Sequence, residues 1–439
     1  MRQLGLALFG LALLTAPAPA QQSTQADDLD RQLSEQETSL RLDPNNVAAL
    51  QSRAVIWFRR GDYDKAIADF TEVIRLTKGS AVSYNNRATA YLRMDEFGKA
   101  IADYNRAIGL GHRSAYADRG LAYAKTGKYD LAFADFDSAL AIDPGSAIAF
   151  ADRARTYVLQ SRLDRALQDF DKAIALNPNM ALLYKERGEA RFTLNEYENT
   201  VADLTKAISL DPRNIEALFT RGKAYSQLNR FEEAIADYTA AIEFAGNRRV
   251  KNHAIAYVAR GSAYQLTRQY QAALADYDKA LEIDPASADA LAERGTTYLK
   301  LKQVGRGLAD LDKSVFLEPD NAGHRNARGV ALAETGQIDK ALEDFSRALS
   351  LDPKLFKAFL NRGQVYASKR RFDEAINDYD AAAKLRPADA EVFYCRGSAY
   401  AKKGEADRAR ADLKKALRLK PVYREATQAL DGLEGRGKK

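Results

Sequence analysis

The chain has 439 residues, 46% of them hydrophobic and 29% charged, which is an ordinary soluble balance with ample material for a core. Its net charge of +6 is the small difference between 66 basic and 60 acidic residues, so charge alone does not indicate a nucleic-acid partner. One cysteine excludes an intramolecular disulfide and a zinc site built on several cysteines, and three histidines leave little for a histidine cluster.

Residues 1–20 have the pattern of a secretory signal peptide. Arg2 precedes an apolar run over 4–16 that is too short to span a bilayer, and residues 18–20 form a small-residue cleavage site. We expect cleavage before Gln21 and an exported protein, periplasmic or secreted. An uncleaved interfacial anchor is the alternative. No membrane span is expected in the mature chain, and export disfavours a nucleic-acid partner.

From residue 47 to residue 423 the chain repeats a unit of 34 residues with small variations in length. Within a unit, position 8 is Gly or Ala, position 11 is usually Tyr, positions 20 and 27 are usually Ala, position 24 is Phe, Tyr or Leu, and position 32 is usually Pro. The eleven copies are 47–80, 81–112, 113–146, 147–180, 181–214, 215–253, 254–287, 288–321, 322–355, 356–389 and 390–423.

Each copy is predicted to hold two amphipathic helices, because its apolar positions 4, 8, 11 and 20, 24, 27 recur at helical spacing. Pro at position 32 ends the second helix, and Gly or an acidic pair near positions 15–16 ends the first. Small residues at positions 8 and 20 let the two backbones approach closely. One hairpin cannot bury both of its apolar faces, so the copies are expected to stack into a solenoid.

This combination of residues resembles the tetratricopeptide repeat (TPR) family over nearly the whole mature chain. The resemblance implies an all-α fold, a right-handed TPR superhelix (an α-solenoid) of eleven helical hairpins, in which the first helix of each pair lines a concave groove.

The segments on either side of the repeats are expected to be capping helices, which terminal repeats need in order to cover an exposed apolar face. One lies within the N-terminal segment 21–46, and the other, followed by a short basic tail, lies within 424–439. Their apolar residues are Leu29, Leu33 and Leu40 in the first segment and Ala426, Leu430 and Leu433 in the second.

Every copy has Arg at position 7 and Asp at position 23. In an antiparallel hairpin that turns near positions 15–16 these two positions lie close, so we expect one structural ion pair per copy, with the Arg stem packed apolarly. A basic ladder for an anionic polymer is the alternative, but matched Asp residues would neutralise it. The pairs include Arg53 with Asp69, Arg119 with Asp135, Arg221 with Asp237, Arg294 with Asp310, and Arg362 with Asp378.

The resemblance further implies that positions 2, 5, 9 and 12 of the first helix face the groove. From the eighth copy onward these positions become more polar. The expected apolar groove residues are Val82, Leu92, Leu121, Ile148, Val158, Leu182, Phe192, Phe219 and Val258. We therefore expect an apolar helix or extended peptide to bind the N-terminal part of the groove. The alternative is that these residues only pack between copies.

The sixth copy carries five extra residues near its end, in the basic segment 244–253. This segment is either a slack junction between copies or a loop that contacts an anion.

Motifs of common enzyme classes are absent: there is no nucleophile elbow, no HExxH and no Walker loop. The three histidines belong to different copies, so no metal, cofactor or catalytic residue is expected. The sequence predicts a non-catalytic exported scaffold that mediates protein–protein interaction by binding a peptide or helix in the concave groove. One alternative is an envelope-assembly adaptor that contacts a polysaccharide or a lipid-linked system. A second and remote alternative is a catalytic protein.

Overall fold

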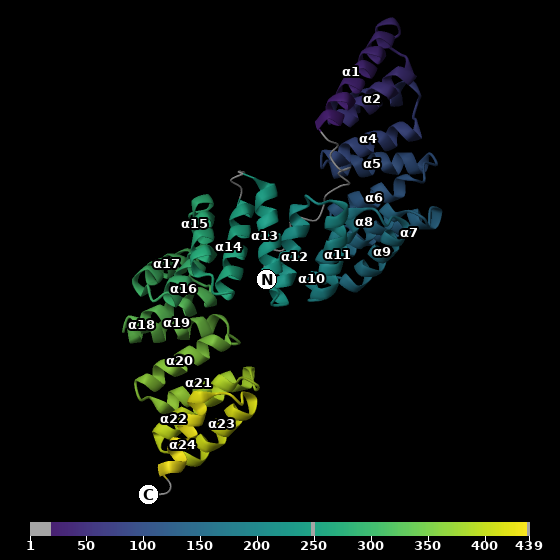
Figure 1. The fold of residues 1–439 in the computed structure, drawn as a ribbon. Helices are drawn as coiled ribbons and strands as arrows, with labels where there is room; N and C mark the ends of the chain where they lie inside the picture. The colour runs from purple at the N-terminus through teal and green to yellow at the C-terminus, as the bar shows by residue number, and fades with distance from the viewer. Residues whose placement is uncertain (1–18, 247–250, 437–439) are drawn as a thin grey trace. The chain divides into compact units, whose positions relative to one another are not determined.

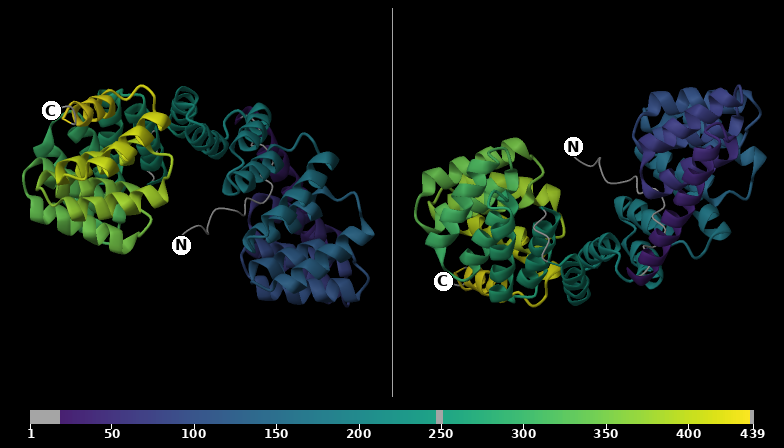
Figure 2. Two further views of the ribbon diagram at one scale, coloured as in Figure 1. Left: turned by 90° about the horizontal axis from the view of Figure 1, so that it is seen from below. Right: turned by 90° about the horizontal axis from the view of Figure 1, so that it is seen from above.

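The computed structural model describes residues 19–246 and 251–436, and within these ranges every regular element is a helix. Consecutive helices pair as hairpins, which gives the all-α solenoid that the repeat pattern predicts (Figure 1). The chain forms two compact units, Met1–Leu228 and Asn229–Lys439, and the boundary falls between the two helices of the sixth copy. Within each unit the helices follow one another in chain order from neighbour to neighbour (Figure 2).

The first unit contains the N-terminal helix, both helices of copies one to five and the first helix of copy six. These are α1 (Pro19–Leu42), α2 (Val47–Arg60), α3 (Tyr63–Leu76), α4 (Ala81–Arg93), α5 (Phe97–Gly109), α6 (Ala115–Lys125), α7 (Tyr129–Ile142), α8 (Ala147–Leu159), α9 (Leu163–Leu176), α10 (Ala181–Thr193), α11 (Tyr197–Leu210) and α12 (Ile215–Gln227).

The second unit contains the second helix of copy six, both helices of copies seven to eleven and the C-terminal helix. These are α13 (Phe231–Ala245), α14 (Lys251–Leu266), α15 (Tyr270–Ile283), α16 (Ala288–Lys300), α17 (Val304–Leu317), α18 (Ala322–Glu334), α19 (Ile338–Leu351), α20 (Phe356–Ser368), α21 (Phe372–Leu385), α22 (Ala390–Lys403), α23 (Ala406–Leu419) and α24 (Arg424–Arg436).

Most first helices begin at a polar residue whose side chain accepts a hydrogen bond from the backbone of the first turn. The caps of this kind are Asn46, Ser80, Ser146, Asn214, Ser287, Asn321 and Asp389. The second helices end before or at position 31, and in eight copies a proline at position 32 prevents continuation. Helices α3, α5 and α13 lack this proline and are followed by a glycine with positive φ, namely Gly79, Gly111 and Gly246.

Every first helix ends at a residue with positive φ at position 15, in all eleven copies. In the copies where the bond is described, the backbone N–H of position 16 then donates to the carbonyl of position 11, as in a Schellman motif. Only four of these residues are glycine. They are Gly61, Asp95, Gly127, Ser161, Asn195, Asn229, Arg268, Lys302, Gly336, Arg370 and Gly404. The turn is therefore imposed by hairpin packing as much as by residue preference.

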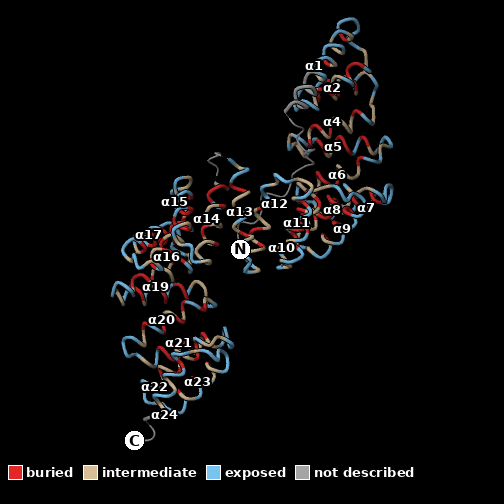
Figure 3. The backbone as a smooth tube through the Cα atoms, viewed as in Figure 1, coloured by how far each residue is buried: buried red, intermediate tan, exposed pale blue. Residues whose placement is uncertain are grey.

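The core lies between the paired helices and between neighbouring copies, where buried positions line the facing sides of the helices (Figure 3). The ring at position 24 is fully buried in copies such as the tenth, where Tyr379 is 2% exposed. It packs on the glycine at position 8: a Cβ on Gly363 would stand 2.7 Å from the Tyr379 ring. The small residue thus makes room for the large one.

Both ends of the described chain pack as capping helices. Leu33 and Leu40 of α1 are buried, and Leu40 contacts the core of the first copy. At the other end Ala426 of α24 is buried, and Leu430 and Leu433 pack on the last copy. Helix α1 begins at Pro19, earlier than the leucine pattern required. Most of the predicted signal peptide and the last residues of the basic tail lie outside the described residues.

Two further observations bear on the sequence predictions. Among the described helices, none combines the length and the apolar character needed to cross a bilayer. In the insertion of the sixth copy, α13 extends to Ala245 and α14 begins at Lys251, and residues 247–250 lie outside the described part. His253, at the end of this insertion, is buried with Nε2 3.4 Å from the carbonyl oxygen of Ile242. Both alternatives for this segment, a slack junction and a loop that contacts an anion, stay predictions.

Candidate binding face on the first helices

The arginine at position 7 and the aspartate at position 23 of one copy form a two-pronged ion pair in ten copies. Nε and Nη2 of the arginine donate to the two carboxylate oxygens at 2.5–2.9 Å. The pairs are 53 with 69, 87 with 103, 119 with 135, 153 with 169, 187 with 203, 260 with 276, 294 with 310, 328 with 344, 362 with 378, and 396 with 412. Arg221 and Asp237, the predicted pair of the sixth copy, belong to different units, and their pairing stays a prediction.

The same arginine also reaches the preceding copy. Its Nη1 donates at 2.5–3.4 Å to a side chain at position 25 of the previous second helix, in every copy from the second to the eleventh. The acceptors are Thr71, Asn105, Asp137, Asp171, Thr205, Thr239, Asp278, Asp312, Ser346 and Asp380. The hydrogen bonds to Asp169 in its own copy, and secondly the one to Asp137 in the preceding copy, raise the pKa of the Arg153 guanidinium against the effect of burial. Each arginine therefore ties its own hairpin to the one before it.

Sequence reasoning missed this third contact, although the signal was present. In copies one to ten, the side chain at position 25 can accept a hydrogen bond from the arginine of the next copy. In copy eleven this position is Lys414, which cannot accept one. Two irregular residues strengthen the same arrangement. Arg191 and Arg325 each donate to the buried aspartate of their copy, Asp203 and Asp344, as a second arginine.

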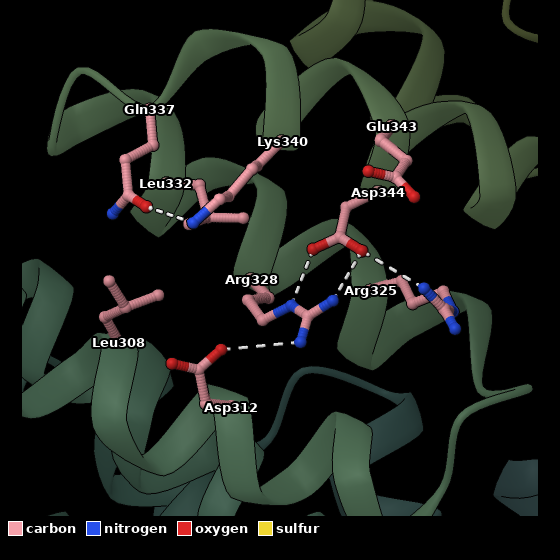
Figure 4. A pocket seen from close by; sticks show the side chains of 9 residues that line it. All are labelled: Leu308, Asp312, Arg325, Arg328, Leu332, Gln337, Lys340, Glu343 and Asp344. Atoms are coloured by element: carbon pink, nitrogen blue, oxygen red, sulfur yellow. Dashed lines mark hydrogen bonds and ion pairs between the residues drawn. The ribbon is translucent and has the colours of Figure 1, made fainter.

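A cavity of about 350 Å³ lies between α17, α18 and α19 of the second unit, and Figure 4 shows its lining. Arg328 stands at its centre with Asp344 on one side and Asp312 on the other (Figure 4). Arg325 donates to the Pro319 carbonyl at 2.6 Å as well as to Asp344. Both arginines are thus paired with groups of the protein itself. We therefore do not interpret this cavity as an anion-binding site.

First helices of successive copies also touch one another, and together their exposed sides form what we call the first-helix face. Polar side chains bridge neighbouring first helices along this face. Gln265 of α14 donates to Thr297 of α16 at 2.7 Å, and Asn361 of α20 donates to Asn326 of α18 at 3.0 Å. The face is therefore continuous from copy to copy within each unit.

In the first unit the floor of the first-helix face is charged. Arg155 of α8 donates to Asp152 of the same helix at 2.5 Å and to Glu186 of α10 at 2.9 and 3.0 Å. Asp152 is 6% and Glu186 4% exposed. Burial raises the pKa of both carboxyl groups, and Arg155 opposes that shift. Nearby, burial and the Asp152 carboxylate raise the pKa of Asp118 to about 6.

The charged floor continues into copies five and six. Lys185 of α10 pairs with Glu216 of α12 and lies 3.7 Å from Glu189. Burial raises the pKa of Glu189 to about 7, against the attraction of Lys185. Burial lowers the pKa of Lys223 of α12, and Glu189 opposes that shift.

Lys223 stands beside two of the predicted groove residues. Its Nζ lies 4.7 Å from the ring centre of Phe192 and 5.6 Å from that of Phe219, so the cation faces two aromatic rings. Both phenylalanines are half-buried, and Phe192 also makes an edge contact with Tyr197 at 5.5 Å. This site joins a cation to partly accessible apolar surface, which suits a ligand with both acidic and apolar groups.

The predicted groove residues fall into three groups. Leu92 and Leu121 are each 5% exposed and belong to one core cluster around Tyr104. Val158 and Val258 are half-buried against the cores of their copies, and Leu182, Phe192 and Phe219 are half-buried as well. Val82 and Ile148 are 43% and 62% exposed. The structure thus places part of the predicted strip in packing and leaves part of it accessible.

The charged residues at position 6 were not predicted as part of this face. Asp118, Asp152 and Glu186 occupy that position in copies three to five, beside the invariant arginine. A run of acidic residues at one repeat position was the available signal.

Among the described residues, one group has the composition of a metal site. The ligand atoms of Asp289, Glu318 and His324 in the second unit all lie within 4.8 Å of one another.

Comparison with known proteins identifies the repeat. Family profiles described as TPR repeat and tetratricopeptide repeat match residues 36–81, 85–147, 188–229, 215–248, 254–287, 276–309, 329–369, 363–404 and 390–421. The chain belongs to the tetratricopeptide repeat family. No curated protein matches this TPR chain.

Several solved structures are similar to the chain. The APC/C hetero-tetramer Cut9-Hcn1 is 15% identical over 94% of each chain, with a TM-score of 0.53, and shows the fold. YrrB, a TPR protein with an unusual peptide-binding site, is 28% identical over 44% of this chain and 96% of its own, with a TM-score of 0.35. The yeast Tom70 is 18% identical over 89% and 95%, with a TM-score of 0.44.

Proposed function

We propose that this TPR protein is a non-catalytic scaffold that binds a peptide or helical segment of a protein partner on its first-helix face. The observation that carries the proposal is the site of Lys223, Phe192 and Phe219, where a half-buried cation stands beside two partly accessible rings. Buried aromatic anchors with a nearby charge are the usual source of affinity at such surfaces. Membership of the TPR family supports the same use, since solenoids of this kind present extended surfaces to partners.

The charged floor around this site supports an amphipathic occupant. Arg155, Glu186 and Lys185 are already paired within the protein, so they shape the face and leave Lys223 as the cation next to the rings. An extended or helical segment with one acidic and one apolar side chain matches this arrangement.

Capture from envelope extract with the mature chain tests the proposal. We expect one or more proteins to be retained, and Phe192→Ala or Lys223→Ala to reduce retention at least about tenfold, since an anchor residue contributes roughly 1–4 kcal/mol. The matched control is Phe316→Ala, which removes an 84% exposed phenylalanine from the second helix α17. Equal retention by all four chains, with unchanged helical melts, would reject this site.

We also propose export, on the signal-peptide pattern of residues 1–20. Expression of the full chain in a Gram-negative host tests it. Mass spectrometry of the purified protein is expected to give a chain that begins at Gln21 in the periplasmic fraction. A chain that keeps Met1 and stays with the cytoplasmic fraction contradicts export.

A further inference from the structure

A histidine in the second unit lies between two carboxylates that come from different elements. His324 is on the first turn of α18, in the ninth copy. Asp289 is on the first turn of α16, in the eighth copy, and Glu318 directly follows α17. Nε2 of His324 is 3.2 Å from Oδ1 of Asp289, and Nδ1 is 3.7 Å from Oε2 of Glu318. The three side chains therefore meet at the junction of two copies.

The histidine is fixed and the carboxylates are free to adjust. His324 is 6% exposed, whereas the side chains of Asp289 and Glu318 are 74% and 50% exposed. Asn321 holds the junction in register, because its Oδ1 accepts from the backbone of His324 at 3.2 Å and its Nδ2 donates to Glu318 at 2.9 Å. A preformed nitrogen ligand is thus combined with two oxygen ligands that can close around an ion.

Protonation of His324 would not give its Nδ1 atom a hydrogen-bond partner. Nδ1 of His324 is buried and has no hydrogen-bond partner, since Glu318 is too distant at 3.7 Å. A buried polar atom without a partner is costly, which points to a group that the protein itself does not supply. Glu293 also lies within electrostatic range of Asp289, His324 and Lys357, which adds a further carboxylate to the surroundings of this group.

We propose that Asp289, Glu318 and Nδ1 of His324 bind a Zn²⁺ ion between the eighth and ninth copies. Zinc takes nitrogen and carboxylate ligands at about 2.0–2.2 Å and accepts water in a fourth position. Tetrahedral ligands at that length are about 3.4 Å apart. Oε2 of Glu318 lies 3.7 Å from Nδ1, close to this value. The ligand atoms of the three residues lie within 4.8 Å of one another, so the exposed carboxylates need only a small inward movement. Imidazole favours zinc over magnesium or calcium, which prefer oxygen alone.

The ion would join α16, the end of α17 and α18, and so fix the angle between two copies. Sequence analysis predicted no metal because it sought clusters of histidine or cysteine. One histidine and two carboxylates spread over 36 residues of two copies form no recognisable motif.

Isothermal titration of the purified, chelator-treated mature chain with ZnCl₂ tests the proposal. We expect one Zn²⁺ per chain, together with a rise in melting temperature on addition of Zn²⁺. Asp289→Asn and Glu318→Gln keep side-chain size on exposed positions and are each expected to weaken binding about tenfold or more. His112→Asn, which removes the half-buried histidine that contacts Ser114, is the matched control and is expected to bind as the unaltered chain does.

Three outcomes overturn the proposal. The first is Zn²⁺ affinity that is the same in Asp289→Asn, Glu318→Gln and the unaltered chain. The second is displacement of Zn²⁺ by an equal concentration of Mg²⁺, which an imidazole ligand should prevent. The third is a melting temperature that responds to pH but not to Zn²⁺, which would make the three residues an ion cluster held by a proton. None of these outcomes depends on the partner proposed for the first-helix face.

Discussion

In nine copies the position-7 arginine makes three hydrogen bonds, two to an almost completely buried carboxylate of its own copy and one to the preceding copy. The eleven aspartates at position 23 are 2–7% exposed. Two prongs of the arginine satisfy this buried charge, and the third reaches the preceding copy, so the residue serves folding within a copy and stacking between copies. Removing the arginine leaves a buried carboxylate without its counter-charge, which is more costly than removing an exposed ion pair.

We predict that Arg294→Met destabilises the second unit by about 2–4 kcal/mol, because Asp310 and Asp278 both lose their cation. Urea denaturation followed by far-UV circular dichroism measures the change. Arg75→Met is the matched control, since Arg75 pairs with Glu72 on the exposed side of α3, and it should leave the denaturation midpoint almost unchanged. A similar midpoint for both variants would contradict a structural role for the position-7 pair.

Glu189 predicts a pH dependence of stability. Its pKa is raised from 4.5 to about 7 in the folded chain because it is buried in the first-helix face. The folded chain therefore binds this proton more tightly than the unfolded chain does. The stabilisation is complete below about pH 4.5 and is lost as the pH rises through 7, so the melting temperature should fall between pH 5 and pH 8.

Glu189→Gln should reduce this slope and raise stability at pH 8 by on the order of 2 kcal/mol, since the amide cannot become a buried anion. Thermal melts at several pH values measure both effects. Glu198→Gln, on the exposed side of the neighbouring helix α11, serves as the control. An unchanged slope in Glu189→Gln would show that Asp118, Asp152 or Glu186 carries the dependence.

At the scale of elements, the two helix backbones of the eighth copy approach each other closely. Position 20 is glycine only there, and a Cβ on Gly295 would stand 2.9 Å from the carbonyl oxygen of Gly307, while a Cβ on Gly307 would stand 2.8 Å from that of Gly295. Backbone atoms cannot turn aside as a ring or a flexible side chain can. The two glycines are therefore matched to one short distance between α16 and α17.

Gly295→Ala should accordingly cost about 1–3 kcal/mol, as overpacking of a close contact does. Gly397→Ala is the comparison, because its Cβ would stand 3.1 Å from the Leu413 side chain and 3.2 Å from the Ala409 carbonyl oxygen, both longer than the 2.9 Å contact of Gly295. Equilibrium denaturation of the two variants is expected to rank Gly295→Ala as the less stable. The reverse order would mean that the helix pair of the eighth copy separates without penalty.

The ends of the first helices offer a stabilising change. Arg370 occupies position 15 with φ of +60°, a conformation in which a side chain with a Cβ is strained. Arg370→Gly should raise stability by roughly 0.5–1 kcal/mol, because relief of strain exceeds the extra entropy of glycine in the unfolded chain. Gly404→Ala, at the same position of the next copy, should have the opposite sign. Thermal melts of both variants test the pair.

For the whole molecule, the repeat pattern predicts the hairpins, their boundaries and the Arg–Asp pairs, because these depend on residues that every copy shares. The first-helix face was predicted only in part, since its contacts differ from copy to copy. Leu121 occupies a position that the family pattern assigns to the groove, yet it is buried beside Tyr104. Glu186 occupies a position that the pattern ignores, yet it binds Arg155 across two copies. Contacts of this kind depend on the spacing between copies, which periodicity does not supply.

The C-terminal cap is predicted to be needed for the second unit. Phe393 and Leu413 are 2% and 0% exposed, and α24 covers their cluster. A chain that ends at residue 423 should expose this apolar surface, bind more of a hydrophobic dye and melt at a lower temperature. The control is a chain that ends at Arg436, which lacks only the last three residues and should melt as the full chain does.

The third hydrogen bond of each arginine always goes to the preceding copy, so neighbouring copies join in one direction along the chain. Any internal copy brings both an arginine that reaches backward and an acceptor for the arginine that follows, so a duplicated internal copy is a complete building block. Lys414 breaks this rule at the end, since a lysine would repel the arginine of a twelfth copy. A copy inserted between two existing copies would therefore find both contacts, whereas a copy placed directly after Lys414 would lack an acceptor for its arginine.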